Sequence, residues 1–493
     1  MRRRLPLFYS ALLLTAVNLM LRMAGTSFQV YLSRRIGAAG IGLLQLTMSV
    51  GGLAMVAGIG GIRTATMYLT AEELGSGRTG TTAHVLSGCF VYSILCSCTV
   101  GAGLYALAPR IAAQWIGDSQ VVDSLRLLAC FLPVSCLCGV MTGYFTAENR
   151  IDTLAAVEIL EQVCSMAVTL MILSVWAGSD PGKACQSVVL GSALGACLTL
   201  GLLILLWVRE KNPVSAPIAI RRRLLRTAVP LAVADVIKSG INTTENLMVP
   251  RRLALAVTDP LAAFGMVTGM VFPVLMFPAC ILFGLAELLI PEIARCAAGG
   301  SNVRISYLMR RSLRVALLYG VFFSGLLFLL ADKLCMGLYN SAAAGAFLRW
   351  YAPLAPMLYC DAITDAMIKG LGQQTASVRI NIFTSALDVL FLFFLLPVYG
   401  MKGYFFSFLL THLINFLLSI RRLLMICPEQ LSIRLPLLTL ICGAGAVWIV
   451  RHFTNPLLAA LAFPPTFLSG LYMLGVISGE DLRWVRQLLQ RRK

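Results

Sequence analysis

The chain has 493 residues, of which 58% are hydrophobic and only 13% are charged, and its formal net charge at pH 7 is +18. Soluble domains carry about 25% charged residues, so this composition excludes a soluble globular protein and indicates an all-α polytopic membrane protein. The loops and tails between the apolar segments are too short to form a separate soluble domain.

The first apolar stretch, residues 7–32, is long enough to cross a bilayer, which takes about 20 mainly apolar residues. It also carries polar side chains at spacings of four, four and three residues, namely Asn18, Arg22, Thr26 and Gln29. These spacings place them on one face of a helix. A charge at mid-membrane costs at least about 2.5 kcal/mol and normally faces water or a buried partner. Arg22 is therefore either a cavity cation for an anionic substrate, or a residue that snorkels to the surface or neutralises an acid.

Apolar segments of similar length recur along the chain, and we predict about fourteen transmembrane helices. With the N-terminus in the cytoplasm, most of the 40 Lys and Arg residues fall in cytoplasmic segments, as the positive-inside rule requires. Both termini are therefore predicted to be cytoplasmic. This topology explains the net charge without nucleic acid binding, and the basic clusters also suit contact with anionic membrane lipids. The predicted spans lie near residues 8–32, 41–67, 83–107, 122–146, 153–176, 184–208, 227–250, 261–290, 312–331, 345–368, 378–397, 403–425, 435–451 and 457–477.

The basic segment 209–226 is the longest strongly charged connector and divides the chain. We predict an N-terminal lobe of six helices over residues 1–208 and a cytoplasmic inter-lobe loop over 209–226. A C-terminal lobe of six helices follows over residues 227–425. Residues 426–493 supply two further helices and a basic tail.

An internal repeat supports this division. Because each half has an even number of helices, the repeats are parallel, with a predicted axis along the membrane normal and a cavity between the lobes. An offset of 224 residues pairs the two halves: Asn18 with Asn242, Arg22 with Asn246, Arg63 with Glu287, and Gly75 with Gly299.

Polar faces recur on other predicted helices. The span near 227–250 carries Asp235, Lys238, Asn242 and Asn246, and the span near 153–176 carries Glu158 and Glu161. Local pairing is the alternative to a cavity role: Asp365 with Lys369, Asp235 with Lys238, and the acids of 153–176 with Arg150 or an arginine of another helix. Burying so many charges without water would be expensive, so we predict an aqueous cavity. The C-terminal half adds Asp361, Asp365, Lys369, Asn381, Asp388, His412 and Asn415.

The sequence contains no phosphate-binding G-x-x-x-x-G-K-[ST] loop, no H-E-x-x-H and no G-x-S-x-G, motifs that would indicate nucleotide-driven or hydrolytic chemistry. We therefore expect neither an enzyme nor a cofactor. The 15 cysteines lie almost all in apolar segments, where we expect buried small hydrophobic residues rather than disulfides or a metal site.

Several blocks resemble the stage V sporulation protein B group of polysaccharide-biosynthesis or oligosaccharide flippases. This group lies within the MOP (multidrug/oligosaccharidyl-lipid/polysaccharide) superfamily, with lipid II flippases and MATE multidrug exporters as more distant relatives. The resemblance implies a two-lobed bundle that flips undecaprenyl-linked sugars by alternating access in the bacterial cytoplasmic membrane. It also implies that basic cavity residues bind the substrate. The blocks are FQVYLSRRIGAAGIGLLQL (28–46), GIRTATMYLTAEELG (61–75), ENLMVPRRL (245–253), MVFPVLMFPACILFGLAELLIPEIA (270–294) and KGLGQQ (369–374).

We therefore expect a flippase of a lipid-linked anionic saccharide, such as a peptidoglycan or polysaccharide precursor, with cell-wall or polysaccharide synthesis enzymes as further partners. The alternative is a proton- or sodium-coupled MATE-type multidrug exporter. It is disfavoured because such exporters place an acid in the first helix, and this one has none. A non-transporting scaffold for cell-wall enzymes is a third interpretation. The candidate cavity residues are Arg22, Arg63, Asn18, Gln29, Lys238, Asn242, Asn246 and Glu287. The candidate ion-coupling residues are Asp235, Glu161 and Asp365.

Overall fold

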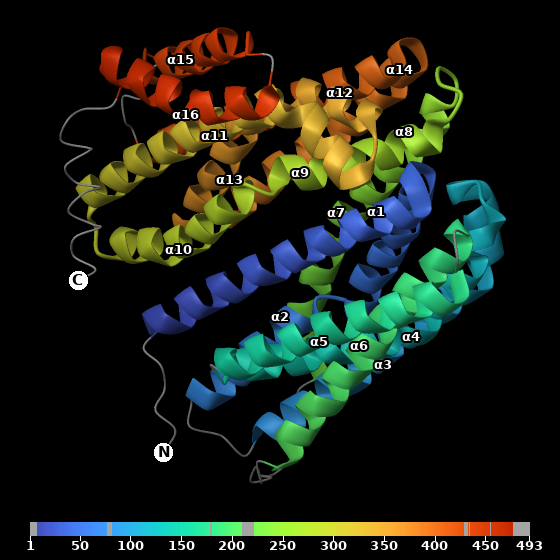
Figure 1. Ribbon diagram of the computed structural model, residues 1–493. Helices are drawn as coiled ribbons and strands as arrows, with labels where there is room; N and C mark the ends of the chain where they lie inside the picture. Colours follow the sequence, from blue (N-terminus) through green and yellow to red (C-terminus); the bar gives the residue numbers. More distant parts are fainter. Residues whose placement is uncertain are drawn as a thin grey trace. The chain divides into compact units, whose positions relative to one another are not determined.

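The computed structural model describes residues 7–75, 81–148, 150–177, 180–209, 221–427, 432, 434–453 and 455–476. Within these ranges every regular element is a helix (Figure 1). This confirms the predicted fold class, because a backbone in lipid must satisfy its own hydrogen bonds and a helix does so within one segment. Most of the predicted 209–226 loop and the basic tail lie outside the described residues.

The chain divides into two compact units. Unit 1 contains Met1–Gly269 and Val389–Met401, and unit 2 contains Met270–Asp388 and Lys402–Lys493. The predicted lobes, 1–208 and 227–425, rest on the sequence repeat rather than on compactness, and they remain a prediction.

Unit 1 holds the first eight helices and a short middle section of α14. Its core gathers side chains from α2 to α7, among them Ile62, Tyr144 and Phe145, which are essentially inaccessible to solvent. The helices are α1 (Leu7–Ile59), α2 (Ile62–Gly75), α3 (Thr82–Arg110), α4 (Val122–Ala147), α5 (Ile151–Ile172), α6 (Pro181–Arg209), α7 (Arg221–Leu253) and α8 (Pro260–Met266).

Unit 2 holds α9 to α13, the two outer sections of α14, and the last two helices. Its terminal helices α15 and α16 pack on α11 around the stacked rings of Phe463 and Phe467, whose centroids are 5.6 Å apart (Figure 1). The helices are α9 (Phe272–Met276), α10 (Ala279–Ala298), α11 (Asn302–Tyr339), α12 (Ala342–Tyr351), α13 (Ala355–Gly370), α14 (Gln374–Ile426), α15 (Arg434–Val450) and α16 (Pro456–Met473).

Glycines set the breaks in the long helices. Gly37 in α1 has a φ of 73° and Gly400 in α14 has a φ of 55°, left-handed values that cost glycine little because it has no Cβ. Each kink falls between two predicted spans, so the sequence-based breaks at 33–40 and 398–402 coincide with real ones. Eight described helices are long and apolar enough to cross a membrane, or nine if a bent pair counts as one span. The count of fourteen remains a prediction.

Several predicted spans are not single α-helices, and one of them, 345–368, is divided into α12, a 3-10 segment over Ala352–Leu354 and α13. The span 41–67 is broken by Gly60 and Gly61, with φ values of 51° and 68°, so that α1 ends at Ile59 and α2 begins at Ile62. The span 261–290 is divided into α8, a π-helical stretch, α9 and α10, with a bend of 65° before α10. Prolines at 273 and 278 explain the second break, because proline lacks the N–H that a continuous helix needs.

Candidate functional site

The polar face predicted on α1 is only partly available to solvent. The Arg22 side chain is exposed, and Thr26 Oγ1 donates to the Arg22 carbonyl at 2.9 Å. Gln29 Nε2 donates to the Gly269 carbonyl at 3.3 Å, so this amide contacts the π-helical stretch after α8. The side chain of Asn18 lies outside the described residues. Arg22 is thus the residue of this face that presents a charge to its surroundings.

The contact between α1 and α8 depends on glycines. A Cβ at Gly265 would lie 2.0 Å from the Ala38 carbonyl oxygen, and a Cβ at Gly42 would lie 2.4 Å from that of Leu261. No side chain fits at these distances, so the backbones approach as closely as small residues allow in membrane helices. This contact fixes the region in which Gln29 meets the Gly269 carbonyl.

Arg63 lies at the start of α2, directly after the break at Gly60 and Gly61, and its side chain is exposed. Its charge acts on the Glu158 carboxylate of α5, as does that of Glu161. Glu161 in turn accepts a hydrogen bond from Thr199 Oγ1 of α6 at 2.8 Å. The structure therefore brings predicted cavity cation Arg63 together with the acids of α5 inside unit 1.

The polar face of α7 divides into an exposed and a packed part. Asp235, Lys238 and Asn242 have exposed side chains. Asn246 instead donates from Nδ2 to Ser49 Oγ of α1 at 3.0 Å. The last of the predicted cavity residues on α7 thus has a packing role against α1, whereas the first three are exposed.

In unit 2, Glu287 of α10 has an exposed side chain. Asp365 pairs with Lys369 at 2.6 Å, which is the local ion pair that the sequence offers as the alternative to ion coupling. Ser377 also donates a hydrogen bond to Asp365. Both partners hold the Asp365 carboxylate in place.

Two further carboxylates of unit 2 are more deeply embedded in hydrogen bonds. Asp361 Oδ2 accepts from Asn415 Nδ2 at 2.9 Å. Asp388 is buried and accepts from Ser407 Oγ at 2.6 Å and from Thr411 Oγ1 at 3.1 Å. The sequence shows these two acids. It does not show their hydrogen-bond partners, because the partners come from other turns and helices.

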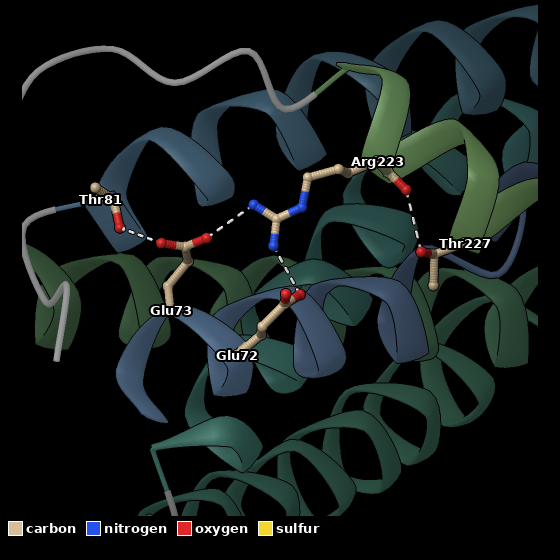
Figure 2. Close-up of polar contacts among 5 residues, drawn as sticks. All are labelled: Glu72, Glu73, Thr81, Arg223 and Thr227. Carbon is tan, nitrogen blue, oxygen red and sulfur yellow. Dashed lines mark hydrogen bonds and ion pairs between the residues drawn. The ribbon is translucent and has the colours of Figure 1, made fainter. Parts of the chain in front are cut away.

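A charged cluster that the sequence does not single out joins α2 to α7. Arg223 Nη2 lies 2.7 Å from Glu72 Oε2, and Arg223 Nη1 lies 3.0 Å from Glu73 Oε1 (Figure 2). From sequence alone, Arg223 belongs to the basic segment 209–226, which the topology explains. Glu73 precedes Arg223 by 150 residues in the sequence, so no local spacing could reveal this ion pair.

The structure is an all-α, multi-pass bundle with charged side chains on its spanning helices. Charged side chains are costly in lipid and usually mark the path of a substrate or ion. These features are typical of a membrane transporter. The chain belongs to the polysaccharide biosynthesis protein family, whose match covers residues 7–297. It is 24% identical over 412 residues to stage V sporulation protein B of Bacillus subtilis (strain 168), covering 80% of this chain and 78% of that relative.

Solved structures share the fold. The lipid II flippase MurJ in an inward closed conformation superposes with a TM-score of 0.71 at 12% identity, covering 94% of this chain and 98% of the other. An inward-facing multidrug resistance MATE transporter of the MOP superfamily has a TM-score of 0.65 at 13% identity, covering 90% and 100%. A MOP superfamily transporter from Pyrococcus furiosus, described as having a binding pocket of reverse polarity, has a TM-score of 0.62 at 12% identity, covering 90% and 96%.

Proposed function

We propose that the protein flips a lipid-linked anionic saccharide, of the undecaprenyl-pyrophosphate type, across the bacterial cytoplasmic membrane by alternating access. The observation that carries this proposal is the charge of α1. The predicted span 8–32, which forms its first part, contains Arg22 but no aspartate or glutamate. A helix with this composition attracts an anion and repels a cation.

The chemistry of a pyrophosphate headgroup matches these residues. Arginine presents a planar fork of donors that binds phosphate oxygens bidentately, and lysine adds a compact positive charge. Arg22, Arg63 and Lys238 all have exposed side chains and belong to unit 1. In this proposal the three cations hold the headgroup, while the apolar tail of the substrate stays in lipid.

The acids of α5 lie near Arg63 and affect how tightly it can bind a phosphate. The Arg63 charge and the Glu158 carboxylate attract each other, so a phosphate that binds Arg63 competes with this attraction. Such competition weakens binding, which a carrier needs because it must also release its substrate. Asp235, with its exposed carboxylate, is the proposed ion-coupling residue that best reaches water, since Glu161 and Asp365 have partners.

The second candidate function is a proton- or sodium-coupled multidrug exporter. It is supported by the exposed carboxylates of Asp235 and Glu287 and by the fold shared with MATE transporters. The family match and the charge of α1 favour the flippase.

Reconstitution separates the two. Proteoliposomes containing the purified protein should expose a fluorescent undecaprenyl-pyrophosphate saccharide to a quencher or a lectin on the opposite face. They should not accumulate a cationic dye when a proton or sodium gradient is applied. Dye transport without lipid flipping would reject the flippase and leave the exporter.

A further inference from the structure

Arg223 forms a fork that joins two acids of one helix to the start of another. The two terminal nitrogens of its guanidinium contact two different carboxylates, Glu72 at 2.7 Å and Glu73 at 3.0 Å, both near the end of α2. Glu73 Oε2 also accepts a hydrogen bond from Thr81 Oγ1, at the start of α3, at 2.9 Å. Figure 2 shows the two carboxylates at the guanidinium and the Thr81 hydroxyl on the far side of Glu73. We name Glu72, Glu73 and Arg223 the α2–α7 clamp.

The two acids of the clamp differ in burial. The Glu73 side chain is 2% exposed, whereas those of Glu72 and Arg223 are 49% and 40% exposed. Glu72 and Arg223 can therefore be hydrated at once if they separate. Glu73 keeps its hydrogen bond from Thr81 when Arg223 leaves, so the buried carboxylate is not stranded without a donor.

The backbone next to the clamp is fitted to a close approach of α7. A Cβ at Gly61 would lie 2.7 Å from the Ala228 carbonyl oxygen, so only glycine allows α7 to pass there. Leu224 and Ala228 are the α7 side chains buried in the core of unit 1. Thr227 Oγ1 donates to the Arg223 carbonyl at 3.0 Å and bonds the first turn of α7 to itself (Figure 2). The start of α7 therefore meets α2 through buried apolar side chains as well as through the clamp.

The clamp links helices that the sequence repeat assigns to different lobes, although both lie in compact unit 1 of the structure. By the 224-residue offset, α2 belongs to the first repeat and α7 begins the second, and their joined ends lie on the predicted cytoplasmic side. Alternating access requires the repeats to move against each other. If α2 and α7 move with their repeats, the bond between them breaks during each cycle.

We propose that the α2–α7 clamp is a cytoplasmic latch, which holds the ends of α2 and α7 together in one state of the transport cycle and opens in the other. This inference rests on the proposed alternating-access function. The alternative is a permanent tether, in which α7 never leaves α2.

Reversible cross-linking distinguishes a latch from a tether. In the double variant Glu72→Cys/Arg223→Cys, a bismaleimide with an internal disulfide joins the two positions, and mass spectrometry of the linked peptides measures the joined fraction. We expect flipping in proteoliposomes to stop in proportion to that fraction and to return after reduction. The single variants, treated in the same way, control for reaction with native cysteines.

A second pair keeps the test valid if the first fails to fold. Glu72→Cys/Thr227→Cys places the linker one turn further along α7 and retains the contact between Arg223 and Glu73. Normal flipping by a fully cross-linked protein of either pair would overturn the latch while leaving the flippase intact. If the uncross-linked, wild-type protein does not flip the lipid, the proposed function fails first.

Opening the latch is tested by removing one charge. Arg223→Gln should shift the ratio of latched to open protein by about tenfold or more, the range for a hydrogen bond between charged groups. Hydrogen exchange of the 62–75 and 221–231 segments reports this shift. Arg222→Gln is the matched control, because Arg222 lies in the same turn and is exposed. Equal exchange in both variants would overturn the latch.

Discussion

Replacing Arg22 by alanine is the most direct test of anion binding by α1. The side chain is exposed, and exposed substitutions usually change the free energy of unfolding by no more than about 0.5 kcal/mol. The loss of one hydrogen bond to a charged phosphate should cost about 1.5–3 kcal/mol of binding free energy, a factor of about 10 to 150 in affinity. If Arg22 instead neutralised a buried acid, its removal would cost about 3–5 kcal/mol of folding stability. Loss of a headgroup-binding residue therefore lowers the affinity for the lipid, whereas loss of a residue that neutralises a buried acid lowers the folding stability.

Thermal unfolding and flipping are measured on the same preparations. We expect Arg22→Ala to unfold near the wild-type temperature and to lose most flipping activity. Arg22→Lys should recover part of it, because lysine keeps the charge but not the bidentate fork. Arg35→Ala is the matched control, since Arg35 is also exposed on α1 but lies beside the Gly37 kink. A destabilised Arg22→Ala, or an equal loss of flipping in Arg35→Ala, would refute headgroup binding by Arg22.

Two further predictions concern paired charges. Glu158→Gln removes a carboxylate that acts on Arg63, so an undecaprenyl-pyrophosphate headgroup should bind more tightly by about 1 kcal/mol, a factor of about five. Weaker binding in a lipid titration would show that Glu158 holds Arg63 in position instead. Glu73→Ala leaves a cavity and removes the acceptor of the buried Thr81 hydroxyl, and should lower the unfolding free energy by about 1–3 kcal/mol. Glu72→Ala removes a half-exposed partner of Arg223 and should cost at most about 1 kcal/mol; equal losses in thermal unfolding would contradict the assigned burial.

The helical architecture was predictable because hydrophobic length alone determines where a chain can cross a bilayer. The kinks at Gly37 and Gly400 fall where polar or glycine-containing connections separate two apolar runs. The break at Gly60 and Gly61 was not predicted, because glycines are also common inside unbroken membrane helices. Only the positive φ values of both residues show that the helix ends there.

The candidate site was predictable as a set of residues but not as a set of contacts. The pair of Asp365 with Lys369 follows from a spacing of four on one helix. The contacts of Asn246 with Ser49 and of Arg223 with Glu73 join distant segments, and a single sequence carries no periodic signal for them. The role of Arg223 was also hard to infer because it lies in a basic segment, where the positive-inside rule explains every arginine and singles out none.

The fold by itself does not decide what this protein carries. A lipid II flippase and a multidrug transporter both share it at 12–13% identity, so the same bundle is found in proteins that carry different substrates. The family match narrows the class, and the side chains must determine the sign of the substrate charge. In the proposed function, Arg22, the one charged residue of the predicted span 8–32, favours an anionic substrate, because a charge inside the membrane is stabilised by an opposite charge.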